Sequence, residues 1–136
     1  MSGTTDANAR HPRLRRWVAE GYTLFLAAVS LWPRPPHLPG EWEIPHADKL
    51  AHALLYGAYA WLLLWTTRRG RSFGFTAAVV VYATAFGGLM EVLQTSISGP
   101  YRSGTLGDAV ANAVGALAGA AVFACRKPAH PSAQRT

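Results

Sequence analysis

The chain has 136 residues, half of them hydrophobic and only 15% charged, and this length suits one compact domain. Its charges lie between long apolar stretches instead of being scattered along amphipathic helices, which argues against a soluble domain. The net charge of +6 and the isoelectric point near 10.1 do not indicate nucleic-acid binding, because the basic residues flank the apolar runs and line no single face. The lone Cys125 excludes an intramolecular disulfide.

Four apolar segments approach the ~20 residues that a helix needs to cross a bilayer. In chain order they cover residues 16–32, 47–66, 73–97 and 105–125. We therefore predict an all-α membrane bundle of four transmembrane helices in residues 14–125. A basic amino-terminal arm, 1–13, precedes this domain, and a tail, 126–136, follows it.

The first segment is the weakest, because Glu20 shortens its uninterrupted apolar run. Arg16 lies four residues before Glu20, so we expect an ion pair along the helix. A basic start and a short apolar core are also typical of a signal peptide. No small-x-small cleavage site precedes the prolines that follow, which favours a retained helix.

Basic residues are distributed unevenly around the segments. Ten of the 13 Lys and Arg residues precede or open the first segment, separate the second from the third, or follow the fourth; only Arg34, Lys49 and Arg102 lie on the other side. The positive-inside rule predicts that both termini are cytoplasmic. Tryptophans also fall near the expected helix ends, as interfacial tryptophans do; they are Trp17, Trp32, Trp42, Trp61 and Trp65.

Polar residues open the second segment and continue along one of its faces. Asp48, His52 and Tyr56 have i, i+4, i+8 spacing, with Tyr59 close to the same stripe and Lys49 beside Asp48. Charged groups are costly inside a bilayer, so their presence here requires an explanation.

Matching faces occur on the third and fourth segments. The third carries Thr84, Gly87, Glu91 and Gln94, and the fourth carries Asp108, Asn112, Gly115 and Gly119. The two glycines of the fourth segment form a small-xxx-small surface that permits close helix packing. At 1.5 Å per residue, His52, Glu91 and Asn112 lie about 6 to 10 Å below the outer helix ends, so three helices bring polar groups to a similar depth.

Structural explanations remain open for most of these residues. Asp48 can serve as a helix N-cap, and Lys49 can extend to the interface. Thr105 and Asp108 resemble a capping box, although Asp replaces the usual Glu or Gln.

The deeper polar residues have structural explanations as well. Asn112 and Gln94 can be interhelical hydrogen-bonding residues, and His52 can be a packing residue. Glu91 is the hardest to explain in this way, because nothing local caps it. Taken together, the charged residues can form a self-neutralising ion network or a functional pocket open to the outer face.

The combined pattern resembles the VanZ family of small bacterial membrane proteins. The matching residues, within 47–120, are Asp48-Lys49-x-x-His52-x-x-x-Tyr56, Glu91-x-x-Gln94, Arg102, and Asp108-x-x-x-Asn112-x-x-Gly115-x-x-x-Gly119. The resemblance implies a multi-pass helical protein of the bacterial cytoplasmic (inner) membrane. The family takes its name from a protein linked to resistance to the glycopeptide teicoplanin, so the resemblance supports the topology more strongly than it supports resistance.

Our first functional hypothesis is an envelope protein, without a cofactor, that binds an anionic lipid or a lipid-linked cell-wall intermediate at an outward-facing polar pocket. Charge-assisted bonds to the phosphate would come from Lys49, Arg102 and protonated His52. Three carboxylates, Asp48, Glu91 and Asp108, would hold these cations, and Tyr56 and Tyr59 would line the apolar part. Gln94 and Asn112 complete the expected binding site. A homo-oligomer remains open.

Two other classes of function are considered. In an intramembrane hydrolase or transferase, His52, Glu91 and Asp108 would bind a divalent metal and activate water. The chain has no HExxH motif and no second histidine on that face, which counts against this hypothesis. A small transporter or channel subunit is the third class, although four spans without inverted repeats make a poor transporter monomer.

Overall fold

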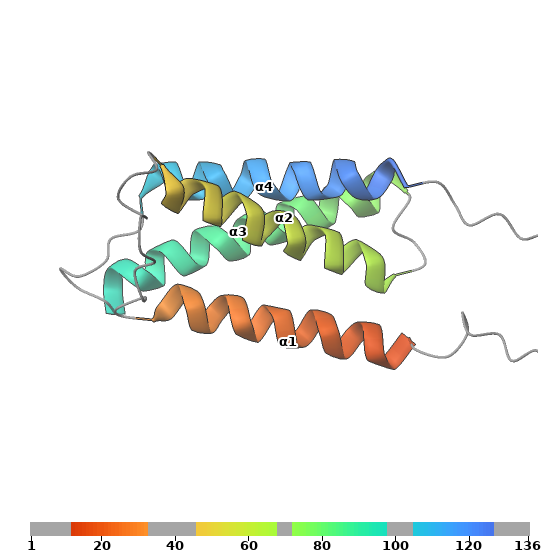
Figure 1. Cartoon of the computed structure of the whole chain (residues 1–136), viewed down its shortest axis with the longest axis horizontal. Helices are drawn as coiled ribbons and strands as arrows, with labels where there is room; N and C mark the ends of the chain where they lie inside the picture. The colour runs from red at the N-terminus through yellow and green to blue at the C-terminus, as the bar shows by residue number, and fades with distance from the viewer. Residues whose placement is uncertain (1–11, 33–45, 68–71, 98–104, 127–136) are drawn as a thin grey trace, which may run out of the picture.

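The computed structural model describes residues 12–32, 46–67, 72–97 and 105–126, and in these ranges all regular secondary structure is α-helical. The four helices are α1 (Pro12–Leu31), α2 (Ala47–Thr66), α3 (Phe73–Ile97) and α4 (Leu106–Ala124) (Figure 1). The bounds of α2 and α3 agree with the prediction. Helix α1 extends further toward the amino terminus than predicted, to Pro12, because proline is well tolerated in the first helical turn, where its missing N–H needs no partner.

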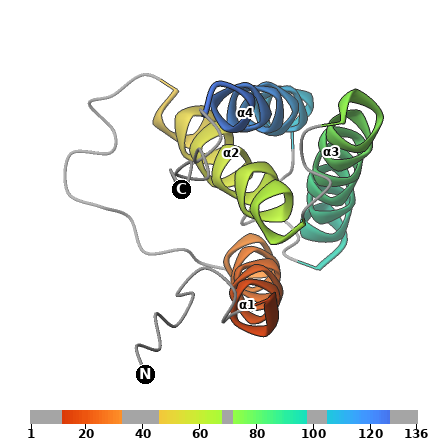
Figure 2. The same ribbon diagram turned by 90° about the vertical axis from the view of Figure 1, so that its right-hand side faces the viewer.

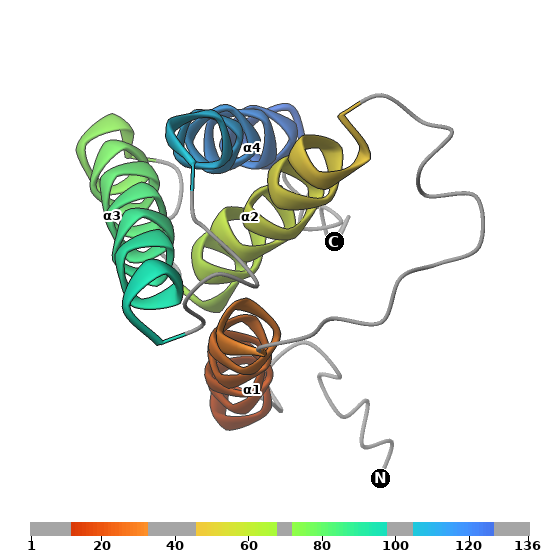
Figure 3. The same ribbon diagram turned by 90° about the vertical axis from the view of Figure 1, so that its left-hand side faces the viewer.

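Successive helices run in opposite directions, and α2 lies at the centre of the bundle (Figures 2 and 3). Helix α4 packs on one side of α2, and α1 packs on the other side, where it also contacts α3. Two arginine–tryptophan contacts bring the start of α1, the end of α2 and the end of α4 to one end of the bundle. Arg15 lies over the Trp65 ring at 4.8 Å, and Arg126 lies over the Trp61 ring at 4.3 Å.

The closest packing in the bundle joins α2 to α4. A Cβ atom at Gly115 would overlap the carbonyl group of Ala53, and one at Gly119 would overlap the carbonyl group of Gly57. The two helix backbones therefore touch directly, as expected from the small-xxx-small spacing of the fourth segment.

Helix ends confirm one structural expectation and correct another. The capping box at α4 is present, since Thr105 Oγ1 accepts a hydrogen bond from Asp108 N (3.2 Å) and Asp108 Oδ2 accepts one from Thr105 N (3.1 Å). The expectation that Asp48 caps α2 is wrong. The N-cap is His46, in the left-handed conformation (φ 62°), and Asp48 lies in the first turn, where its charge still complements the helix dipole.

The surface of the bundle is more apolar than that of a soluble protein. Large apolar side chains are exposed along the described helices, including Trp17, Leu24, Phe73, Val92 and Leu106. Buried positions, by contrast, include Glu91, Gln94, Asp108 and Asn112. Within the described ranges, α3 and α4 are long and apolar enough to cross a membrane. An apolar exterior is what a bilayer requires, and together with these two helices it indicates a membrane protein.

Candidate functional site

His52, Glu91 and Asn112 meet between α2, α3 and α4. His52 Nδ1 lies 3.0 Å from Asn112 Oδ1 and 3.5 Å from Glu91 Oε1. Asn112 Nδ2 donates to the same Glu91 oxygen at 3.5 Å, close to the limit of a hydrogen bond. Asn112 is fully buried, and the side chains of His52 and Glu91 are 14% and 9% exposed. The convergence expected from helical spacing is therefore present in the structure.

The neighbours of the His52 ring favour one tautomer. Two acceptor oxygens face Nδ1, so this nitrogen carries a proton. The Asn112 amide must have its oxygen toward His52, because the opposite orientation would place that oxygen against the Glu91 carboxylate. In the neutral ring, Nε2 is then unprotonated and can accept a proton; in the protonated ring, Nε2 becomes a donor.

Gln94 and Gly87 are buried on the same face of α3 as Glu91. Gln94 is 1% exposed, and its Nε2 donor has no hydrogen-bond acceptor among the described residues. A buried unsatisfied donor is costly, so it calls for a partner such as a water, an ion or a ligand. Gly87 leaves room for its neighbours, because a Cβ atom there would lie 2.7 Å from Asn112 Nδ2 and 3.0 Å from Tyr56 Cε1.

A second charged group lies nearer the start of α2. Lys49 Nζ is 2.9 Å from Asp48 Oδ2 and 3.6 Å from Asp108 Oδ1, so it bridges carboxylates of α2 and α4. The lysine stem passes over Gly107, where a Cβ atom would lie 2.8 Å from Lys49 Cε. Asp48 is exposed at the surface, whereas Asp108 is buried. Two carboxylates thus hold Lys49 in place, and a third, Glu91, pairs with His52.

The remaining predicted residues are distributed as follows. Tyr56 is buried beside Gly87, but the Tyr59 hydroxyl instead lies 3.0 Å from Thr23 Oγ1 on α1. Thr84 is only partly buried. Arg102 lies outside the residues that the structure describes.

The three expected metal ligands are not gathered into one site. His52 contacts Glu91, but the Asp108 carboxylate is held by Thr105 and Lys49. Among the described residues, no group of three His, Cys, Asp or Glu side chains is arranged to hold a metal ion. As the described structure places them, His52, Glu91 and Asp108 therefore do not form one divalent-metal site.

Sequence reasoning missed the contacts that attach α1 to the bundle. Tyr22 donates a hydrogen bond to the Leu55 carbonyl at 2.9 Å, and Arg15 stacks on Trp65. The spacing of Trp61 and Trp65 by one helical turn, opposite an arginine-rich segment, was the available signal, because arginine and tryptophan commonly pair.

Comparison with known families gives a match over nearly the whole chain. The sequence model of the VanZ/LLP1 family matches residues 6–127. Comparison with curated proteins and with solved structures finds no significant match.

Proposed function

Because the chain belongs to the VanZ/LLP1 family, we propose that it is a multi-pass protein of the bacterial cytoplasmic membrane that binds a lipid head group in the envelope. In this proposal all four helices span the bilayer and both termini are cytoplasmic. Two observations support the topology: the antiparallel order of the helices, and the clustering of Arg15 and Arg126 at one end of the bundle. The His52–Glu91–Asn112 cluster then opens toward the outer face.

Reporter fusions test this topology. Fusions after Cys125 and within 68–72 should report a cytoplasmic position, and a fusion within 35–43 should report the outside. A cytoplasmic signal from 35–43 would overturn both the topology and the outward-facing site.

The ligand we propose is an anionic lipid or a lipid-linked cell-wall intermediate. The observation that carries this proposal is the His52–Glu91–Asn112 cluster together with the unsatisfied amide donor at Gln94 Nε2, on the same face of α3 as Glu91. Phosphate oxygens accept from Gln94, from Lys49 and from the Nε2 of protonated His52. The His52 cluster and the neighbouring Lys49 group together carry three carboxylates and one lysine, and such acceptors suit the hydroxyl or amino groups of a glycosylated or peptide-bearing head group.

Lipid analysis of the purified protein tests this ligand. The chain is extracted in native-lipid nanoparticles, and its bound lipids and metals are measured together. We expect His52→Ala, Glu91→Gln and Asp108→Asn to lose the anionic species bound at the outer-face cluster while keeping the fold. Val122→Ala, at an exposed position of α4 away from the cluster, should keep that species.

The same variants separate a binding site from a structural ion network. In a purely structural network, Glu91→Gln would lower the thermal midpoint, and a second change at His52 would restore it, because an unpaired buried charge is costly. Unchanged lipid content in all three variants, at normal protein levels, would contradict the proposal. Complementation of a deletion strain, scored for envelope defects and teicoplanin sensitivity, tests the link to resistance.

A second candidate function rests on the His52 geometry. A carboxylate and an amide hold Nδ1, leaving the neutral ring's Nε2 able to take a proton from water or from a substrate hydroxyl, as in carboxylate–imidazole general bases. This favours acid–base chemistry on a lipid-linked substrate over the metal-dependent route. Product formation in proteoliposomes that survives EDTA and disappears in His52→Ala would support it. Loss of product on chelation would restore the metal hypothesis.

A further inference from the structure

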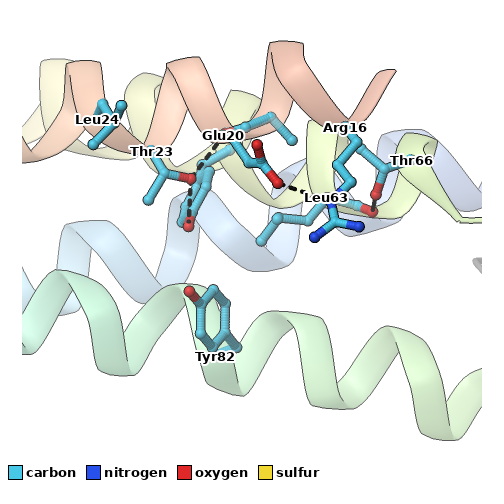
Figure 4. Close-up of a pocket in the computed structure, with 9 residues that line it drawn as sticks. Arg16, Glu20, Thr23, Leu24, Leu63, Thr66 and Tyr82 are labelled. Atoms are coloured by element: carbon cyan, nitrogen blue, oxygen red, sulfur yellow. Dashed lines mark hydrogen bonds and ion pairs between the residues drawn. The ribbon is translucent and has the colours of Figure 1, made fainter. Parts of the chain in front are cut away.

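A separate groove lies between α1, α2 and α3, away from the His52 cluster. Its volume is about 460 Å³, within the range of small-molecule sites, and its walls include Arg16, Glu20, Thr23, Leu24, Leu63 and Tyr82 (Figure 4). Along α1 it runs from Arg16 to Leu24, which corresponds to about 12 Å of helix. That length is close to the depth of one bilayer leaflet, because the hydrocarbon core is about 30 Å thick.

The floor of the groove contains hydroxyl groups whose hydrogen bonds are already made within the protein. Tyr59 is completely buried, and its hydroxyl lies 3.0 Å from Thr23 Oγ1, which in turn donates to the Ala19 carbonyl at 2.8 Å. These hydroxyls therefore require no partner from a ligand. The sides are formed by apolar surface of Leu24, Leu63 and the Tyr82 ring, and Leu24 and Tyr82 are 72% and 53% exposed. Such a surface suits a hydrocarbon chain.

Arg16 stands at the end of the groove nearer the start of α1. Its side chain is 80% exposed, and its Nε donates to Glu20 Oε1 at 2.8 Å, an exposed ion pair along the helix that confirms the pairing expected from the sequence. Figure 4 shows the guanidinium turned from α1 toward Leu63 and Thr66 of α2. Nε alone is engaged by Glu20, so the two terminal amino groups can form the paired hydrogen bonds that guanidinium makes with phosphate.

The basic end of the bundle defines where a head group would lie. Arg13, Arg15, Arg16 and Arg126 lie at this end, and the Trp61 and Trp65 rings stack against two of them. Tryptophan rings of membrane proteins concentrate at the head-group level. Arg16 is thus at the depth of lipid phosphates of the cytoplasmic leaflet in the orientation proposed above.

We propose that this groove binds one anionic glycerophospholipid of the cytoplasmic leaflet, with an acyl chain along Leu24 and Tyr82 and the phosphate on Arg16. The surrounding lipid tails are as apolar as the groove, so an acyl chain alone gains little binding free energy by entering it. Selectivity must then come from the head group, where the basic end of the bundle complements a net negative charge. Glu20 acts as a positioning residue that holds the arginine over the groove.

Native mass spectrometry of the full chain tests this proposal. The protein is mixed in detergent with dioleoyl phosphatidylglycerol or with dioleoyl phosphatidylcholine, two lipids that share acyl chains and differ in head-group charge. We expect the protein to bind one phosphatidylglycerol molecule tightly and to bind phosphatidylcholine more weakly. Arg16→Gln should lower the affinity for phosphatidylglycerol about tenfold, since one charge-assisted contact is lost. Arg16→Lys should retain part of the affinity, because it keeps the charge and loses the paired geometry.

Matched variants locate the site. Arg13→Gln removes an equal charge from the same helix but not from the groove, and it should leave the affinity unchanged. Leu24→Trp narrows the groove and should lower the affinity, whereas Phe25→Trp at the next position should not. His52→Ala should keep the groove lipid, so failure of the head-group site proposed above and failure of this site are distinguishable.

Three results would overturn the groove site. An equal loss of phosphatidylglycerol affinity in Arg13→Gln and Arg16→Gln would mean that diffuse surface charge, and not the groove, attracts the lipid. Equal binding of the two lipids would remove head-group selectivity. If Leu24→Trp kept its phosphatidylglycerol affinity while Arg16→Gln lost it, the lipid would contact the arginine but would have no acyl chain in the groove.

Discussion

The two sides of α2 are built in different ways. Against α4, the backbones touch through Gly57, Gly115 and Gly119, with no side chain between them. Against α1, side chains such as Tyr22 and Thr23 make the contacts and leave a groove beside them. The tight side fixes the distance between His52 and Asn112, whereas the loose side leaves space for a lipid. We therefore expect substitutions on the α4 side to cost more than those on the α1 side.

The largest effect is expected at Gly115. In Gly115→Leu the new side chain would collide with the Ala53 carbonyl, which is part of the α2 backbone and cannot rotate away. Overpacking costs about 1–3 kcal/mol and sometimes more, and we expect the upper end here. The thermal midpoint in detergent measures the loss. Gly21→Leu on α1, where a Cβ atom meets nothing within 4 Å, is the matched control and should be close to neutral. Equal losses would mean that the two sides do not differ.

A smaller effect is expected from Gly87→Ala, because its methyl group would press on the side chains of Asn112 and Tyr56. We expect a loss of about 1–3 kcal/mol in unfolding free energy and displacement of the Asn112 amide. Gly88→Ala, whose methyl group meets nothing within 4 Å, should be neutral or stabilising by about 0.5–1 kcal/mol, since alanine is the better helix former. A stable Gly87→Ala protein with an unchanged His52 environment would contradict the described packing.

The His52 ring offers a spectroscopic test of the contact between α2 and α4. Nitrogen-15 NMR of the neutral wild-type ring should show the proton on Nδ1, because Asn112 Oδ1 and Glu91 Oε1 both face that nitrogen. Asn112→Leu removes one acceptor and should shift the tautomer ratio toward Nε2–H, with a stability loss of about 1–2 kcal/mol. A ratio that does not change would show that Asn112 does not orient the ring.

The smallest effect is expected where α1 is attached at the basic end. Arg15→Gln removes the guanidinium that lies 4.8 Å from the centre of the Trp65 ring. Exposed cation–π contacts contribute about 0.5–1 kcal/mol, and the thermal midpoint should fall accordingly. Arg13→Gln changes the same charge and serves as the control. A fall of similar size in both variants would assign the effect to net charge.

Local signals were sufficient to locate the helices. The bounds of α2 and α3 agree with the prediction because breaker-rich segments flank continuous apolar runs. The Thr105–Asp108 capping box was also readable, since its bonds join residues three apart. The N-cap of α2 could not be predicted in this way. His46 makes no side-chain cap hydrogen bond, and no short motif indicates its left-handed backbone.

By itself, the sequence determined that the chain is helical, that it is apolar outside, and that Asp48, His52, Glu91 and Asn112 have the spacing to reach neighbouring helices. Periodicity and composition carry this information because they depend on residues close together in the chain. Only the tertiary structure decided that His52 pairs with Glu91 and Asn112 while Asp108 pairs with Lys49, which separates the expected metal ligands. That partition depends on the rotation and approach of whole helices, set by backbone contact at Gly115 and Gly119, and the groove beside α1 exists because that helix lacks such contact.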